Sequence, residues 1–375
     1  MKPFANQFIG KLGVLALLTG VSHSSVQAED SMILFGGQED GARVELNEAR
    51  FGTRYRYAKD AADNKIASLL EYAATLDVSV YFWGDRIQID LEAATGDNAL
   101  SKYVASTIGD EGEAADWDTE FNIRRLSLTL RPDNNGNVEL TIGAFSPEHG
   151  AGTELTGLDK DIPIMGYKAK VKYGEGKGYV AVTMGNVDPT GTVNVFDRFE
   201  DFGNDNNYLQ VLVHHMISEA LSVSVDWTQY GADNDNFIRG AVKYSPSQWK
   251  NTTIILEAMT RLQNDDIAGD EAGYVFAATI NHKLENVLAG RTVILEGSLM
   301  YVDDENDIRF PLASFLPVGP SARIAASIPD LFVRGNLSVE AYTEAVFAFD
   351  NDAMEIRTGL SAGFGGSSIS GIRAE

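Results

Sequence analysis

The segment Leu70–Phe82 alternates strictly between two kinds of position. One set of alternate residues is apolar throughout: Leu70, Tyr72, Ala74, Leu76, Val78, Val80 and Phe82. The set between them is mostly polar: Glu71, Ala73, Thr75, Asp77, Ser79 and Tyr81. Successive side chains of an extended strand point to opposite faces, so this segment has one apolar and one polar face. Because the pattern recurs to the end of the chain, it predicts an all-β fold, a transmembrane antiparallel β-barrel.

The first 28 residues have the order of parts that marks a signal peptide. Lys2 and Lys11 are the only charges, an apolar run covers 12–21, and Val26-Gln27-Ala28 supplies small residues for cleavage. A retained membrane anchor is the alternative interpretation of this segment. We expect residues 1–28 to be removed and residues 29–375 to form the barrel, without a second domain.

Composition excludes several other classes of protein. A spanning helix needs about 20 apolar residues, and the longest uncharged candidate, 310–322, contains Pro311, Pro317 and Pro320. With 0 cysteines, an exported chain must be held by its hydrogen-bond ladder and packing, which a closed barrel provides. The net charge of −24 argues against nucleic acid as a partner, because phosphates require Lys and Arg.

Alternating segments of similar length follow one another along the whole chain. The predicted strands are 42–58 (with a bulge near 48–50), 70–82, 86–93, 121–131 (with a parity shift at Arg124-Arg125), 138–145, 167–173, 179–185, 208–216, 221–230, 237–244, 253–262, 274–284, 293–302, 337–349 and 354–364, with 322–333 as a further candidate. Bacterial barrels usually have even strand numbers. We therefore predict 16 strands, with 14 and 18 as open alternatives. A soluble β-sandwich with aromatic core residues is the competing fold.

Basic side chains occupy the polar faces of several predicted strands. Lys168, Lys170 and Lys172 alternate with apolar residues, and a lysine near the membrane midplane costs about 2–4 kcal/mol when it faces lipid. These residues should therefore face the lumen. The pore-lining candidates are Arg54, Arg56, Arg124, Arg125, Lys168, Lys170, Lys172, Asp90 and Glu92. They would set ion preference, or simply solvate the lumen and pair across strands.

The segment 146–166 joins two strands and is too long for a turn. Its charged residues are Glu148, Glu154, Asp159, Lys160 and Asp161. Connections of this length inside a domain are usually functional. We predict that this segment folds inward as a constriction, and an external surface loop is the alternative.

Catalytic and metal-binding patterns are missing from the sequence. His149, His214, His215 and His282 are scattered, and the adjacent pair points to opposite sides of its strand. No Gly-x-Ser-x-Gly motif accompanies them. We therefore expect neither an enzyme, nor a metal site, nor a cofactor.

A short region carries a family resemblance. Arg124-Arg125-Leu126-Ser127-Leu128-Thr129-Leu130 leads to Leu140-Thr141-Ile142-Gly143-Ala144-Phe145-Ser146-Pro147 and then to Glu154-Leu155-Thr156-Gly157. This resembles the phosphate-selective porin O/P-like group. The resemblance implies a 16-stranded, trimeric outer-membrane channel. Arg124 and Arg125 match its strand motif, the three lysines suggest an analogous role, and the acidity elsewhere opposes anion preference.

The last alternating segment, 354–364, ends at the aromatic Phe364 and is followed by a tail, 365–375; a poorer last strand would be 367–373. The expected function is a porin in the outer membrane of a Gram-negative bacterium, passing small hydrophilic solutes or ions. Its partners would be outer-membrane lipid, lipopolysaccharide and two further copies in a homotrimer. A non-channel barrel (structural or surface protein) and a secreted all-β binding protein are the alternatives.

Overall fold

The computed structural model describes most of the chain after residue 31. The described residues are 32–36, 41–60, 62, 64–96, 102, 104–106, 121–133, 135–152, 155–158, 161–188, 193–199, 202–203, 206–231, 235–262, 272–303, 318–334, 337–350 and 353–365. The predicted signal peptide and the tail after Gly365 lie outside these residues, as do Glu154, Asp159 and Lys160.

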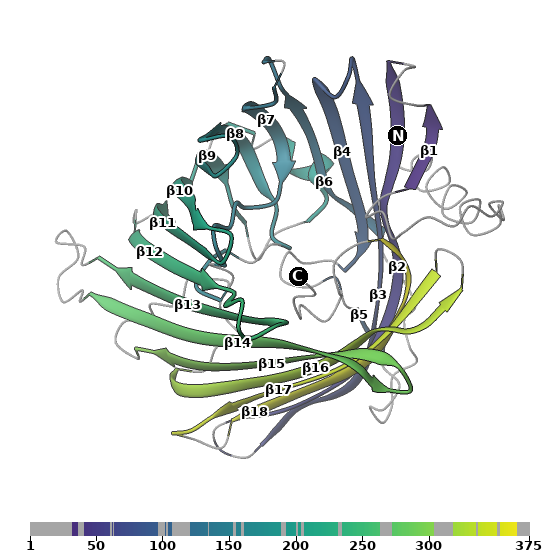
Figure 1. Ribbon diagram of the computed structural model, residues 1–375, viewed down its shortest axis with the longest axis vertical. Helices are drawn as coiled ribbons and strands as arrows, with labels where there is room; N and C mark the ends of the chain where they lie inside the picture. Colours follow the sequence, from purple (N-terminus) through teal and green to yellow (C-terminus); the bar gives the residue numbers. More distant parts are fainter. Residues whose placement is uncertain are drawn as a thin grey trace.

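Within the described residues, a ring of 16 antiparallel strands closes on itself (Figure 1). Each strand pairs with its neighbour in the ring, and β18 pairs with β2 to close it. The strands are β2 (Ala42–Lys59), β3 (Lys65–Phe82), β4 (Ile87–Thr95), β6 (Phe121–Leu130), β7 (Val138–Phe145), β8 (Ile164–Tyr173), β9 (Gly178–Asn186), β10 (Tyr208–Ser218), β11 (Leu221–Tyr230), β12 (Asp235–Tyr244), β13 (Thr252–Arg261), β14 (Gly273–Leu288), β15 (Arg291–Val302), β16 (Gly319–Arg334), β17 (Leu337–Ala348) and β18 (Met354–Gly365). The predicted all-β antiparallel barrel and its strand number are confirmed, and the barrel is consistent with the transmembrane one that was expected.

Three short elements lie beside the ring and were not predicted. β1 (Met32–Gly36) pairs with the start of β2, next to the point where β18 ends. β5 (Val104–Ser106) pairs with β3 beyond the end of β4. The helix α2 (Val195–Arg198) packs against β6 on the outer side of the wall, where Val195 joins a cluster with the outward-facing Ala144 and Met165.

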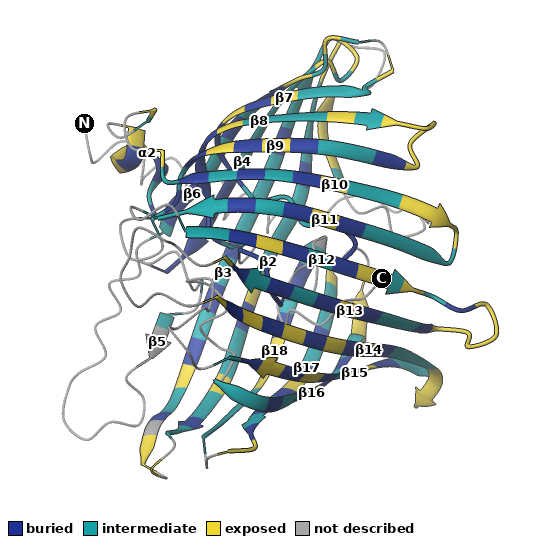
Figure 2. Ribbon diagram, turned by 90° about the vertical axis from the view of Figure 1, so that its left-hand side faces the viewer, coloured by how far each residue is buried: buried dark blue, intermediate teal, exposed yellow. Residues whose placement is uncertain are grey.

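Apolar side chains point outward and polar side chains point inward along the strands. On β12 and β13, Ile238 and Leu256 are 42% and 52% exposed, whereas the intervening Arg239 and Glu257 are 1% and 4% exposed. Figure 2 shows this alternation as bands of buried and exposed residues along the neighbouring strands. An exposed apolar exterior suits lipid contact and is the reverse of a soluble sandwich.

Two bulges change the facing of residues within a strand. The first bulge is in β6, opposite β4. Arg125 pairs with Glu92 and Ile123 pairs with Ala93, so Arg124 is the extra residue of β6. The parity shift predicted at Arg124-Arg125 is therefore confirmed. In β2 the register shifts between Leu46 and Glu48. The bulge predicted at 48–50 is real but lies slightly earlier, at Asn47.

The two ends of the barrel differ in the length of their connections. At one end, which we call the turn end, strands are joined by short turns such as 83–86, 174–177 and 219–220. At the other, the loop end, the connections include 146–163, 187–207 and 303–318. No helix in the described part of the chain is long and apolar enough to span a membrane.

Candidate functional site

The connection between β7 and β8, residues 146–163, runs along the inside of the barrel wall; we call it the inward loop. The predicted segment was three residues longer, because Ile164–Gly166 belong to β8. The loop backbone bonds to side chains of successive strands. Tyr179 of β9 donates its hydroxyl to the His149 carbonyl at 3.1 Å. Ser224 of β11 accepts from the Ala151 amide at 2.9 Å. Since Tyr179 and Ser224 share the inward parity of their strands, the loop lies within the ring.

Two buried charged residues hold the middle of the inward loop. Glu257 Oε2 of β13 accepts from the Leu155 amide at 3.0 Å and from both the amide and the hydroxyl of Thr156 at 3.1 Å. Arg239 of β12 donates to the Thr156 carbonyl at 3.3 Å. The same guanidinium bonds to the carboxylate of Asp226. Because backbone groups and carboxylates are costly to bury without partners, these contacts fix the loop to the wall.

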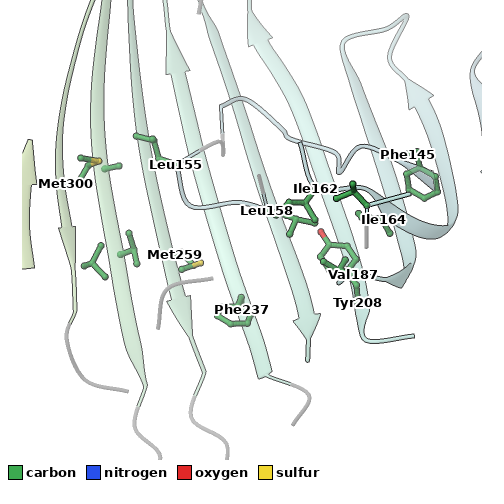
Figure 3. Packing of buried hydrophobic residues seen from close by; sticks show 14 residues of the cluster. Phe145, Leu155, Leu158, Ile162, Ile164, Val187, Tyr208, Phe237, Met259 and Met300 are labelled. Carbon is green, nitrogen blue, oxygen red and sulfur yellow. The ribbon is translucent and has the colours of Figure 1, made fainter. Parts of the chain in front are cut away.

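Apolar side chains fill the space between the inward loop and the wall near the loop end. Leu155, Leu158 and Ile162 of the loop pack with residues from several strands, shown in Figure 3. The strand partners are Phe145, Ile164, Tyr208, Phe237, Met259, Val275, Ala277, Met300 and Val302, and Val187 and Val193 of the connection between β9 and β10 join them. The inner wall is therefore apolar in this sector, which differs from the wholly polar lumen expected from alternation. These residues bury their apolar surface against the loop instead of exposing it to water in the lumen.

The lysine row faces inward at the root of the loop. Lys168 and Lys170 place their ammonium groups 3.1 and 3.2 Å from the carboxylate of Glu148. Lys172 lies 2.7 Å from Glu139 of β7. Burial would raise the pKa of Glu148, but the charges of Lys168 and Lys170 outweigh it and hold the pKa below its ordinary value. Two glutamates thus neutralise much of this row.

The lowered pKa of Glu148 predicts a specific pH dependence. A carboxyl whose pKa is depressed in the folded state stabilises that state above its unfolded pKa, here about 4.5, and this stabilisation is lost as the pH falls through the folded value. We expect the loop root to stay anchored at neutral and mildly acidic pH, and to loosen as the pH falls through the lowered pKa of Glu148 in the folded protein. Single-channel noise measured against pH checks this. Glu148→Gln should lack the acidic transition, and an identical transition in both proteins would contradict the assignment.

At the far end of the loop, two acids and two bases form a compact group. Lys102, in the connection between β4 and β6, lies 2.9 Å from Glu92 and 3.1 Å from Asp161. Arg125 lies 2.7 Å from Glu92 and 3.8 Å from Asp161. Three predicted site residues, Glu92, Arg125 and Asp161, are therefore brought together with Lys102, which the sequence did not single out.

Of the remaining predicted residues, Arg54 and Arg56 face inward and pair with Glu71 and Glu355, the latter at 2.9 Å. Asp90 also faces inward, where Gln88 donates to it at 2.6 Å. Arg124 differs from the rest. Its side chain is completely buried and donates to the Thr95 carbonyl at 3.4 Å, so protein encloses its guanidinium.

Basic and acidic residues are interleaved around the wall, rather than segregated into one basic and one acidic side. The sequence could predict which residues face inward. It carried no signal for Glu257 and Arg239 as loop anchors, because their partners include backbone amides and a carbonyl, which every residue type has. Among the described residues, no group of three or more histidine and acidic side chains is placed to hold a metal ion.

The fold has known counterparts. No family model matches the chain and no curated protein matches its sequence, so the resemblance to the phosphate-selective porin O/P-like group stays a prediction. Among solved structures, a mutant of the Rhodopseudomonas blastica porin aligns with a TM-score of 0.53 and 10% identity, covering 86% of this chain and 100% of the porin. Pseudomonas putida OprB aligns with a TM-score of 0.54 and 8% identity, over 86% and 94% of the two chains. The fold of this chain is that of the bacterial porins.

Proposed function

We propose that this protein is an outer-membrane porin of a Gram-negative bacterium, a water-filled channel for passive diffusion of small hydrophilic solutes or ions. In this proposal residues 1–28 are removed on export and three copies assemble in the membrane, surrounded by lipid and lipopolysaccharide. The inward loop narrows the lumen, and the charged residues of the wall act on the solutes. No covalent chemistry and no cofactor is required.

The observation that carries the proposal is the contrast between the two faces of one closed ring. The outer face exposes apolar side chains on strand after strand, while the inner face carries ion-paired charges such as Arg54 with Glu71 and Lys172 with Glu139. A loop fixed along part of the inner wall reduces the width of the lumen. Together these features supply lipid contact outside, a polar path inside and a size limit.

Conductance in planar bilayers tests the proposal. The purified mature protein should insert and give stepwise increases in current. A bilayer that stays closed, with protein whose gel mobility shows a folded barrel, would favour the non-channel barrel. Protein that stays monodisperse without detergent would favour the secreted binding protein.

The lysine row predicts a change in ion selectivity. We expect Lys168→Glu, Lys170→Glu and Lys172→Glu together to shift the reversal potential toward cations, because three positive charges become negative beside Glu148 and Glu139 in a confined space. Replacing the same lysines by glutamine should give a smaller shift in the same direction. An unchanged reversal potential in the glutamate variant would place these residues outside the conducting path.

A further inference from the structure

A continuous chain of ion pairs crosses the inner wall on β15 to β18, β2 and β3. Its first half lies on β15 to β18. Arg323 of β16 pairs with Glu296 of β15 on one side and with Glu344 of β17 on the other, the latter at 2.6 Å. Arg357 of β18 lies 4.0 Å from the same Glu344. Each guanidinium thus has a carboxylate as its neighbour on the next strand.

The second half of the chain continues onto β2 and β3. Arg357 also pairs with Glu355 of β18, which lies 2.9 Å from Arg56 of β2. Arg56 is 4.0 Å from Glu71 of β3, and Glu71 pairs with Arg54. We call this whole row, from Glu296 to Arg54, the charge belt. Arginine and glutamate are equally represented in it, so its net charge is zero.

Every residue of the charge belt lies within six residues of the loop end of its strand, in the same part of the barrel as the anchors of the inward loop. Arg323 is four residues from the loop end of its strand, and Glu344 is four residues from the loop end of β17. Arg239 and Glu257, which hold the loop, are likewise four residues from the loop ends of β12 and β13. The loop contacts strands from β8 to β15, and the belt lies on β15 to β18, β2 and β3, which follow one another around the ring (Figure 1). Loop and belt therefore form the two sides of one narrow level.

The described charges of the loop side are also balanced at this level. Asp161 and Glu92 face Lys102 and Arg125, two acids against two bases. Arg239 pairs with Asp226. Glu257 and Glu148 add two acids, and Lys168 and Lys170, which flank Glu148, add two bases. The excess of acidic over basic residues in the whole sequence is therefore not found in this part of the wall.

We infer, on the basis of the proposed channel function, that the charge belt makes the narrow level electrically neutral. This level then selects polar solutes without net charge, including zwitterions, over ions of either sign. An ion passing the belt meets alternating charges whose fields cancel beyond a few ångströms, and it loses hydration without a compensating counter-charge. A polar neutral solute finds donors and acceptors in alternation along the same row.

Reversal potentials under a KCl gradient measure the neutrality of the belt. With both solutions near 1 M, where the Debye length is about 3 Å, charges farther than this from a passing solute are screened, while those of the belt, which the solute touches, are screened much less. We expect the wild-type potassium-to-chloride permeability ratio to lie within about threefold of unity under these conditions. Liposome swelling should be faster with glycine than with sodium lactate or choline chloride, which add charge at similar size.

Two neighbouring substitutions should shift the ratio in opposite directions. Arg323→Gln leaves Glu296 and Glu344 without their shared cation and should favour potassium. Glu344→Gln leaves Arg323 and Arg357 in excess and should favour chloride. The double variant removes one charge of each sign and should return the ratio to the wild-type value. If either single variant does not fold, the more exposed pair Arg56→Gln and Glu355→Gln serves the same purpose.

The outcomes separate this inference from the proposed function. An open channel with a strongly ion-selective wild type at high salt would overturn the neutral belt and leave the channel intact. Shifts of the same sign in both single variants would also overturn it. A bilayer that stays closed would contradict the channel itself. Wild-type neutrality, opposite shifts and recovery in the double variant would together support the inference.

Discussion

Gly166→Ala is expected to abolish most folding of the barrel. Gly166 of β8 is paired with Gly143 of β7 and with Gly185 of β9, so three glycines lie side by side in the wall. A Cβ added to Gly166 would lie 2.1 Å from the carbonyl oxygen of Met184 and 2.6 Å from the Cα of Gly185. Real Cβ atoms essentially never approach other atoms within 3.0 Å. Both neighbours are backbone, so the clash cannot be relieved by a side-chain rotation.

The strands must separate to admit the methyl group, and that breaks ladder hydrogen bonds at the point where the inward loop begins. Adding a methylene to a packed site typically costs about 1–3 kcal/mol, and a backbone clash should exceed this range. The same row contains Gly143, whose φ is +120°. A Cβ added to Gly143 would lie 2.3 Å from the carbonyl oxygen of Leu126, so this position excludes a side chain as well.

Heat-modifiable gel mobility of refolded protein measures the effect. The matched control is Gly297→Ala in β15, where the nearest atom to the new Cβ is Ile280 Cγ2 at 3.8 Å, an ordinary contact. We expect the control to fold like the wild type. A Gly166→Ala protein that folds to the wild-type yield would show that the wall is not closed at this row.

Alternation predicted the strands well because lipid and lumen act on every strand with the same period of two. Even β16, which the pattern marked only as a further candidate, is a ring strand from Gly319 to Arg334. The pattern failed for β1 and β5, which have few residues each and exist through pairing with β2 and β3. Their register is a tertiary property that a short segment does not encode on its own.

The sequence predicts which side chains point into the barrel, but not which of them contact one another. Alternation places Arg54 and Glu71 on the inner side, yet their pairing depends on the register of β2 against β3. The apolar patch around Phe237 and Met259 departs from the polar lumen expected of a porin, since these residues bury surface against the loop. The length of the loop predicted a special role. Its position depends on backbone groups of residues 155 and 156, which leave no mark in the sequence.

Glu257→Ala is expected to release the inward loop and to change the channel more than any other single substitution in the lumen. The carboxylate of Glu257 accepts three hydrogen bonds, from the amides of Leu155 and Thr156 and from the Thr156 hydroxyl. Its removal leaves both amides buried without this acceptor, at about 1–3 kcal/mol each. Since about 1.4 kcal/mol corresponds to a factor of ten in an equilibrium, the detached loop should become at least tenfold more populated.

Single-channel recording should then show a noisier current, because the loop exchanges between the wall and the lumen, and exclusion of larger neutral solutes should change with it. Glu257→Gln is the matched control, since its amide oxygen can still accept from Leu155 and Thr156 while the charge is lost. If the lost charge alone were responsible, both variants would behave alike. If the hydrogen bonds hold the loop, the alanine variant fluctuates while the glutamine variant stays close to the wild type. A quiet current from folded Glu257→Ala protein would mean that the apolar contacts of Leu155, Leu158 and Ile162 hold the loop without Glu257.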